Sequence, residues 1–405
     1  MFLSKTWWNL REFARQTWIR IALISGLALL SAAVTPVVSW FLPEGLKEAF
    51  DEEAAESLLQ ILTGTMLGVA TFSLSVMVSA HHYASSQVTP RSHRLLRQDG
   101  RTQSVLATFI GAFVYALVSL IIINASIFSG RDFAVSYGVT VVVIVLVVVA
   151  LVRWVQQLTA LGSTEETTRR VEAVCRTALD ARVATPCMGG MRYHPDLIPN
   201  DAVAILAEES GYVRHLDVEA LNRRAREIGG IGHLEVLPGD WVNVGDVLLH
   251  MEAERLSVEE MTELQDQVTL GDMRSFDQDP AFGLEVMSEI GQRALSPGIN
   301  DPGTATDVVR LQLRLLERWR DGEAGEGEHR LEHMRIRALE PGDLVTHAFD
   351  RIARDGANLA EIQIVVQKAL AVLARHECDG LADAARAISA RALLRSDAAL
   401  TLAED

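Results

Sequence analysis

The chain has 405 residues, 49% of them hydrophobic, and a formal net charge of −16 that is unevenly spread. Residues 1–158 carry 11 Lys and Arg against 9 Asp and Glu, whereas residues 159–405 carry 26 against 44. An apolar, nearly neutral part is therefore joined to an acidic one. We expect no nucleic-acid partner, because proteins bind phosphates through clustered Lys and Arg.

Four apolar segments are long enough to cross a bilayer as helices, which takes about 20 residues. They cover residues 19–42, 58–80, 105–128 and 133–152; the last three contain no charged residue and the first contains only Arg20. The apolar run of the first segment exceeds the roughly 7–15 residues of a signal-peptide core, so we expect a retained anchor. The sequence predicts a four-helix transmembrane domain over residues 1–159, with the lipid bilayer as its partner.

Short basic flanks predict the orientation, since Lys and Arg favour the cytoplasmic side. The loop between the first two segments holds one Lys against six acids and is expected outside. Both termini are then on the cytoplasmic side of the cytoplasmic (inner) membrane. The residues expected inside are Lys5, Arg11, Arg15, Arg20, Arg91, Arg94, Arg97 and Arg101.

Beyond the membrane, the sequence predicts an α+β cytosolic domain in three parts. Residues 160–200 form a connecting helix and linker, with Ser163 and Glu166 at capping-box spacing. Residues 201–256 form a small β-rich module, and residues 257–405 are mainly helical. The phrases "SGYV" and "PGDWVNVGDVLL" resemble the halves of a β-barrel-sandwich module of the biotinyl and lipoyl type. No Lys stands in the hairpin turn, so no cofactor is expected.

The stretch "ALSPGINDPGTA" lies between two predicted helices, each begun by an Asp-Pro pair. Asp at the N-cap accepts a hydrogen bond from an unpaired N–H, and Pro is tolerated at the first helical position. The stretch is then a tight connector, although N–H groups at a helix start can also receive an anion and make a ligand or gating site. The residues concerned are Ser296, Asn300, Asp301, Gly303 and Thr304.

Several motifs together resemble the predicted bacterial membrane proteins of domain-of-unknown-function family 2254. They are "SSQVTPR", "FIGAFVY", "SGYV" with "PGDWV", and "FDQDPAFGL" with "ALSPGINDPGTA", and they cover nearly the whole chain. The resemblance implies the architecture and no activity.

A stripe of small and hydroxyl-bearing residues recurs every three or four positions along the second segment. Such a stripe either lets helices approach closely or lines a water-filled path. Its residues are Gly64, Gly68, Thr71, Ser75, Ser79 and His82. The loop that follows gathers a basic patch, which fixes the topology or attracts anions and acidic lipid headgroups. Its residues are His81, His93, Arg91, Arg94, Arg97 and Arg101.

No catalytic constellation is found, and we predict neither an enzyme nor a metal site. Cys175, Cys187 and Cys378 lack the spacing of a zinc site or a disulfide framework. The motif "HRLEH" at 329–333 fits a zinc-protease pattern, but it runs into an alternation typical of a strand.

The leading hypothesis is a homo-oligomeric channel-like or passive transport protein, gated by its cytosolic domain, that passes a small ion or anionic ligand. The alternative is a membrane-anchored sensor or scaffold that binds a cytosolic ligand or protein. The absence of charged residues within most of the spans disfavours active transport, which usually needs a titratable relay.

Overall fold

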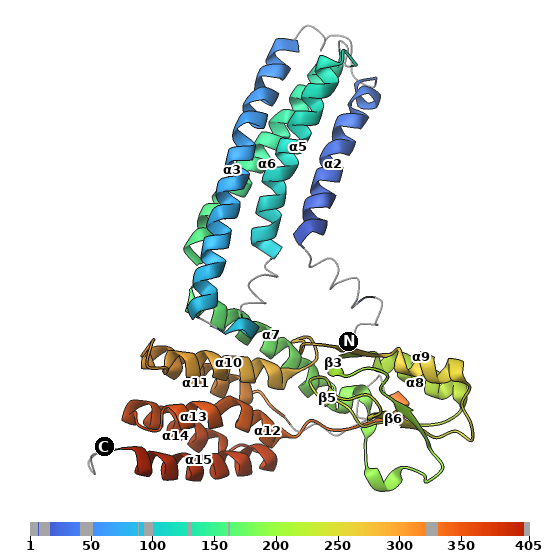
Figure 1. Ribbon diagram of the computed structural model, residues 1–405, viewed down its shortest axis with the longest axis vertical. Helices are drawn as coiled ribbons and strands as arrows, with labels where there is room; N and C mark the ends of the chain where they lie inside the picture. The colour runs from blue at the N-terminus through green and yellow to red at the C-terminus, as the bar shows by residue number, and fades with distance from the viewer. Residues whose placement is uncertain are drawn as a thin grey trace. The chain divides into compact units, whose positions relative to one another are not determined.

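The computed structural model describes residues 7, 17–40, 52–87, 89–92, 100–127, 131–160, 163–320 and 331–400 (Figure 1). The chain divides into two compact units, residues 10–166 and residues 167–405. The first unit contains the helices α2 (Thr17–Ser39), α3 (Glu52–Gln87), α5 (Gly100–Asn124) and α6 (Arg131–Ala160).

Three helices are long and apolar enough to cross a membrane, among the described residues. They are Glu53–Ala80, Gln103–Asn124 and Asp132–Leu158, in α3, α5 and α6. Three of the four predicted spans are confirmed to this extent. Helix α2 covers most of the remaining one, residues 19–42, and its crossing stays a prediction.

Helix α5 is the centre of this unit, since α2, α3 and α6 all pack against it. Phe109 and Tyr115 of α5 are fully buried beside apolar side chains of α3 and α6. The Tyr115 hydroxyl donates to the Ser136 carbonyl of α6 at 3.2 Å. A Cβ atom on Gly111 would lie 2.6 Å from Ile24 of α2, so this glycine sets how closely α2 approaches α5.

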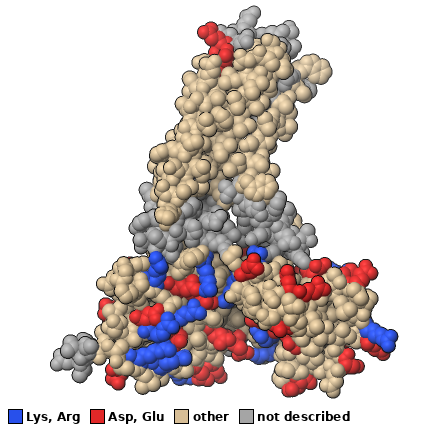
Figure 2. Space-filling view, viewed as in Figure 1, with Lys and Arg blue, Asp and Glu red and all other residues tan. Residues whose placement is uncertain are grey.

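The outer surface of α6 is apolar. Figure 2 shows the helical unit almost free of charged side chains on the face drawn, apart from acidic residues at one end. A surface of this kind belongs in hydrocarbon, where α-helices satisfy their own backbone hydrogen bonds. The exposed valines of α6 are Val141, Val142, Val145, Val148, Val149, Val152 and Val155.

The second unit begins along α7 (Thr164–Ala184) and contains two open sheets. The first has the order β1-β8-β4-β6-β2, parallel where β8 pairs with β1 and β4, and antiparallel elsewhere. The second has the antiparallel order β5-β3-β7. The strands are β1 (Gly190–Arg192), β2 (Val203–Leu206), β3 (Gly211–Leu216), β4 (Gly232–Leu234), β5 (Trp241–Val242), β6 (Val247–Met251), β7 (Val268–Gly271) and β8 (Leu331–Ile336).

The described strands form two open sheets rather than the expected barrel-sandwich. Strands β3 and β5 do pair, with Tyr212 opposite Trp241, as the two motif halves suggest. Strand β6 leaves this pair and joins β2 and β4 in the other sheet, so neither sheet closes. The sheets also draw β1, β7 and β8 from outside the predicted module of residues 201–256, because local alternation predicts a strand but not its partner.

Helices α8 (Val218–Ile228), α9 (Val258–Gln265), α10 (Pro280–Ala294), α11 (Pro302–Leu316), α12 (Pro341–Val345), α13 (Arg351–Asp355), α14 (Ala360–Leu373) and α15 (Asp379–Ala399) complete the unit. Both Asp-Pro helix starts are confirmed. Asp279 accepts the N–H of Phe282 and Asp301 accepts the N–H of Thr304, each with Pro at the first helical position. A π-helical turn at Thr346–Asp350 joins α12 to α13.

We predict that Gly111→Val destabilises the membrane unit, because the added methyl groups collide with Ile24. Overpacking of this kind costs roughly 1–3 kcal/mol. Gly138→Val is the matched control, since a Cβ atom on this exposed glycine of α6 meets nothing within 4 Å. Thermal unfolding in detergent micelles should give a lower midpoint for Gly111→Val than for the control. Equal midpoints would show that α2 does not depend on this close approach.

Candidate functional site

The predicted stripe on α3 lies on the outside of the single-chain bundle. Gly64, Gly68, Thr71, Ser75, Ser79 and His82 are all exposed. At 3.6 residues per turn they fall within an arc of roughly 80°. The buried residues of α3 lie on its other side, against α5: Leu59, Leu62, Met66, Ala70 and Ser73.

The stripe is open and without charged side chains at its centre. A Cβ atom at Gly64 or Gly68 would meet nothing within 4 Å in this chain. The Thr71 hydroxyl donates to the carbonyls of Leu67 and Gly68, both at 3.0 Å, so its hydrogen bonds stay within its own helix. The face can therefore accept another helix at close range or contact water.

The inner-face basic patch is described only in part. His81 and His82 lie within α3, which continues to Gln87 because no Pro or Gly interrupts it. Their expected place in a loop is therefore wrong. Arg91 is exposed and Arg101 falls in the first turn of α5. His93, Arg94 and Arg97 lie outside the described residues.

The connector between α10 and α11 is held by its own hydrogen bonds. Ser296 donates to the Arg293 carbonyl at 2.6 Å, and Asn300 adopts a left-handed φ of 50°. The Asp301 carboxylate accepts both the N–H and the hydroxyl of Thr304, at 3.1 and 2.5 Å. A Cβ atom on Gly303 would lie 3.2 Å from that carboxylate. Because a carboxylate already holds these donors, the geometry favours the connector over an anion site.

A network of buried charges lies at the start of α10, in the motif "FDQDPAFGL". Arg274 contacts the Asp279 carboxylate at 2.8 Å and the Glu285 carboxylate at 2.7 Å. Arg351 of α13 contacts the other oxygen of Glu285 at 3.0 Å. The Arg274 guanidinium also lies 4.9 Å from the centroid of the Phe282 ring. These charges join the loop after β7 to α10 and α13.

The same motif ties α10 to the sheet and to the π-helical turn. The Gln278 amide exchanges two hydrogen bonds with the backbone of Leu216 in β3, at 2.9 and 3.1 Å. The Ser288 hydroxyl lies 2.6 Å from the carbonyls of His347 and Ala348, which the π turn frees from regular helical bonding. Gly239, with φ of +100°, leaves room for the Asp279 carboxylate.

The two carboxylates of the network respond oppositely to their surroundings. Burial raises the pKa of Asp279 to about 6, although Arg274 and the Phe282 N–H favour its charged form. Burial also opposes ionisation of Glu285, but Arg274, Arg351 and His347 outweigh it and lower its pKa. Sequence reasoning found the motif and its N-cap but missed this network, whose signal was several charged residues inside an otherwise apolar stretch.

A bundle of long apolar helices joined to a large α+β unit defines an integral membrane protein. The chain belongs to the family described as "Predicted membrane protein (DUF2254)", whose model matches residues 14–372. The resemblance carried by the motifs is thereby confirmed.

Two curated relatives are similar to most of this chain. They are "Uncharacterized protein Rv1290c" of Mycobacterium tuberculosis and "Uncharacterized protein Mb1321c" of Mycobacterium bovis. Each is 27% identical over 316 residues, which is 76% of this chain and 59% of the relative. The chain thus spans less than two thirds of the length of these relatives. No solved structure matches it.

We predict that the titration of Asp279 makes the α+β unit of residues 167–405 less stable as the pH rises from about 4 to about 6. In this interval the folded form binds a proton that the unfolded chain, with an ordinary pKa near ~4, has released. The free energy of unfolding therefore falls with pH, by at most about 1.4 kcal/mol per pH unit. Asp279→Asn keeps an N-cap oxygen and removes this titration.

The measurement is urea unfolding of the detergent-solubilised protein at several pH values, followed by fluorescence. At each pH, the free energy of unfolding of Asp279→Asn is subtracted from that of the parent. This difference isolates Asp279, because the other carboxylates titrate in both proteins. Asp301→Asn is the control, since the pKa of this exposed N-cap is lowered, chiefly by the Thr304 hydroxyl. If the difference in the free energy of unfolding between parent and Asp279→Asn is the same at pH 4 and pH 6, the raised pKa of Asp279 is contradicted.

Proposed function

We propose that the protein is a homo-oligomeric, channel-like passive transport protein in which the α3 stripes of neighbouring chains meet around the passage. The observation that carries the proposal is the outward position of the stripe. Glycine and hydroxyl groups form a stripe on the uncovered face of a membrane-length helix, beside exposed apolar residues such as Leu67, Phe72 and Val78. On the opposite face of α3, large apolar side chains are buried inside the bundle.

The contrast between α3 and α6 supports an assembly. Exposed positions of α6 are largely valine, as suits contact with lipid tails. The α3 stripe offers lipid little apolar side-chain area, whereas small residues allow a second helix to approach closely. One chain supplies too few spans to enclose a water path alone, so a ring of identical subunits around α3 is the simplest closed arrangement.

The chemistry of the spans supports passive movement. Residues 58–80, 105–124 and 133–152 contain no Asp, Glu, Lys or Arg. A coupled carrier usually needs a titratable group at membrane depth. A path lined by Gly, Ser and Thr would instead offer weak hydroxyl and carbonyl contacts that a small ion can enter and leave.

We further propose that the α+β unit faces the cytoplasm and gates the passage. Its large size and its buried charge network give it a well-defined structure that a ligand could bias. The same features would also suit the alternative, a membrane-anchored sensor or scaffold. The two functions differ in whether solute crosses the membrane through this protein.

We predict that Ser75→Cys forms a disulfide between two chains when membranes are treated with a mild oxidant. The three native cysteines are buried and should not compete. Val148→Cys is the matched control, because Val148 is exposed on α6, outside the stripe. A gel should show a dimer for Ser75→Cys and a monomer for Val148→Cys. Dimers at both positions, or at neither, would contradict assembly along α3.

We predict ion flux through liposomes that contain the parent protein, and its loss in Gly68→Trp. The indole would occupy the open face of α3 where neighbouring chains meet. Gly138→Trp is the control, since Gly138 is also exposed with nothing within 4 Å of a Cβ atom. It should conduct as the parent does. Size-exclusion chromatography checks that each variant remains folded and shows its oligomeric state.

Flux that persists in Gly68→Trp would place the path elsewhere. Absence of flux in the parent across salts and pH would contradict the channel and favour the sensor or scaffold. Expression of residues 160–405 alone would then be informative, because full function from this fragment would mean that the spans conduct nothing essential.

A further inference from the structure

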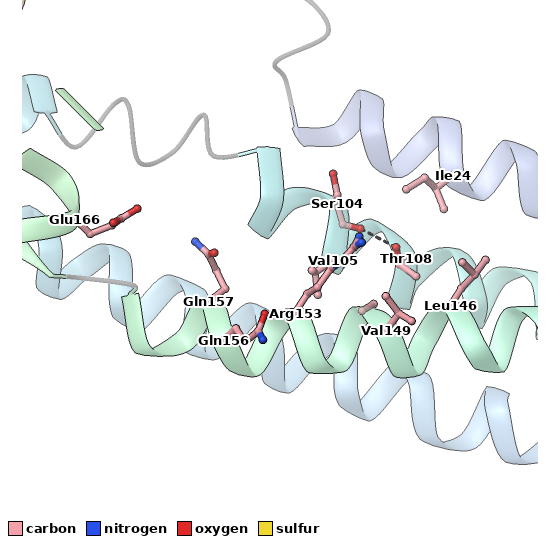
Figure 3. A pocket seen from close by; sticks show the side chains of 11 residues that line it. Ile24, Ser104, Val105, Thr108, Leu146, Val149, Arg153, Gln156, Gln157 and Glu166 are labelled. Atoms are coloured by element: carbon pink, nitrogen blue, oxygen red, sulfur yellow. Dashed lines mark hydrogen bonds between the residues drawn. The ribbon is translucent and has the colours of Figure 1, made fainter. Parts of the chain in front are cut away.

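A cavity of about 890 Å³ lies between the helices of the membrane unit, on a different part of the bundle from the α3 stripe. Helix α6 contributes one face to it, through residues spaced three and four apart. Helix α5 contributes Ser104, Val105 and Thr108, and α2 contributes Ile24. Figure 3 shows these side chains around one space.

The lining changes from apolar to polar along α6. Leu146, Val149 and Ala150 come first, and Arg153, Gln156 and Gln157 follow. By the helical rise of 1.5 Å per residue, Arg153 lies about 32 Å along the axis from Asp132. The hydrocarbon core of a bilayer is about 30 Å thick, so Arg153 falls where headgroups replace acyl chains. The polarity of the cavity thus follows that of a lipid molecule.

Arg153 is exposed and, among the described residues, forms no ion pair and no hydrogen bond. Figure 3 shows its side chain reaching across the cavity toward Ser104 and Thr108 of α5. The Thr108 hydroxyl donates to the Ser104 carbonyl at 2.9 Å. Glu166 also lines the cavity and lies away from Arg153 in the same view.

We propose that this cavity binds one phospholipid with an anionic headgroup. The Arg153 guanidinium would hold the phosphate through its fork of N–H donors, which suits phosphate oxygens. An acyl chain would lie along Val149, Leu146 and Ile24. Charge selects the occupant, because a neutral detergent would bring no anion to the guanidinium. A soluble phosphate would leave the apolar part uncovered.

The site is distinct from the ordinary layer of surrounding lipid. A basic side chain near a membrane surface attracts anionic lipids in general, by ~1 kcal/mol. A built cavity should instead hold a fixed number of molecules, and binding should saturate at one per chain. It should also depend on the apolar wall as well as on the charge.

The test is native mass spectrometry of the full-length protein in detergent, titrated with phosphatidylglycerol or with phosphatidylcholine. The parent should bind one phosphatidylglycerol per chain, roughly tenfold more tightly than phosphatidylcholine, because the choline cation offsets the phosphate charge that Arg153 would pair with. Arg153→Gln should reduce this preference to about one, whereas Arg153→Lys should keep most of it. Arg131→Gln, at the other end of α6, is the matched control and should bind as the parent does.

A second pair of variants tests the apolar wall. Val149→Trp fills the cavity and should abolish saturable binding with Arg153 intact. Val148→Trp, at the next position and outside the lining, should not. A midpoint of thermal unfolding near that of the parent shows that each variant is folded.

Three results would overturn the proposal. One is equal binding of phosphatidylglycerol by the parent and Arg153→Gln. Another is equal loss of binding in Val148→Trp and Val149→Trp. The third is displacement of the lipid by millimolar inorganic phosphate, which would identify a site for a free anion. None of these depends on ion flux, so the site and the proposed channel can fail independently.

Discussion

The packing of the membrane unit depends on which residues α3 places on each of its two faces. Large apolar side chains, Leu59, Leu62 and Met66 among them, are buried against α5, and the glycine and hydroxyl positions face outward. Between helices in a bilayer there is little hydrophobic driving force, because lipid tails are as apolar as leucine. Close packing therefore depends on small residues, and this chain leaves its main set of them on an uncovered surface. The proposed assembly with other copies rests on that constraint.

In the α+β unit, a network of polar contacts holds many short helices and strands in one arrangement. Glu285 and Asp279 share Arg274, while Gln278 and Ser288 occupy backbone groups of β3 and of the π-helical turn. Buried ion pairs add little net stability compared with apolar residues, but a partner left unpaired is strongly unfavourable. The network therefore acts against alternative packings of α10, and a unit of this kind is suited to having few defined states.

The sequence predicted what depends on local chemistry. Apolar length predicted the spans, and N-cap chemistry predicted the starts of α10 and α11. Alternation predicted a strand after the motif at 329–333, and β8 covers Leu331–Ile336. The sequence did not predict which segments far apart along the chain contact one another. Strand β6 pairs with β2 and β4 rather than completing a barrel with β3 and β5, and Arg351 reaches Glu285 from another helix. No local pattern contains this information. The cavity was missed for the same reason, because its wall combines residues of four helices, α2, α5, α6 and α7.

The two open features of the membrane unit differ in the partner that their chemistry suits. The centre of the α3 stripe carries no charge and offers small side chains, so it matches another helix or a column of water. The cavity beside α6 joins the Arg153 guanidinium to an apolar wall, so it matches a molecule with an anionic head and a hydrocarbon tail. If a lipid fills that cavity, α2, α5 and α6 gain a shared contact that α3 lacks. The bundle would then be reinforced on its lipid side while α3 remains free to meet its neighbours.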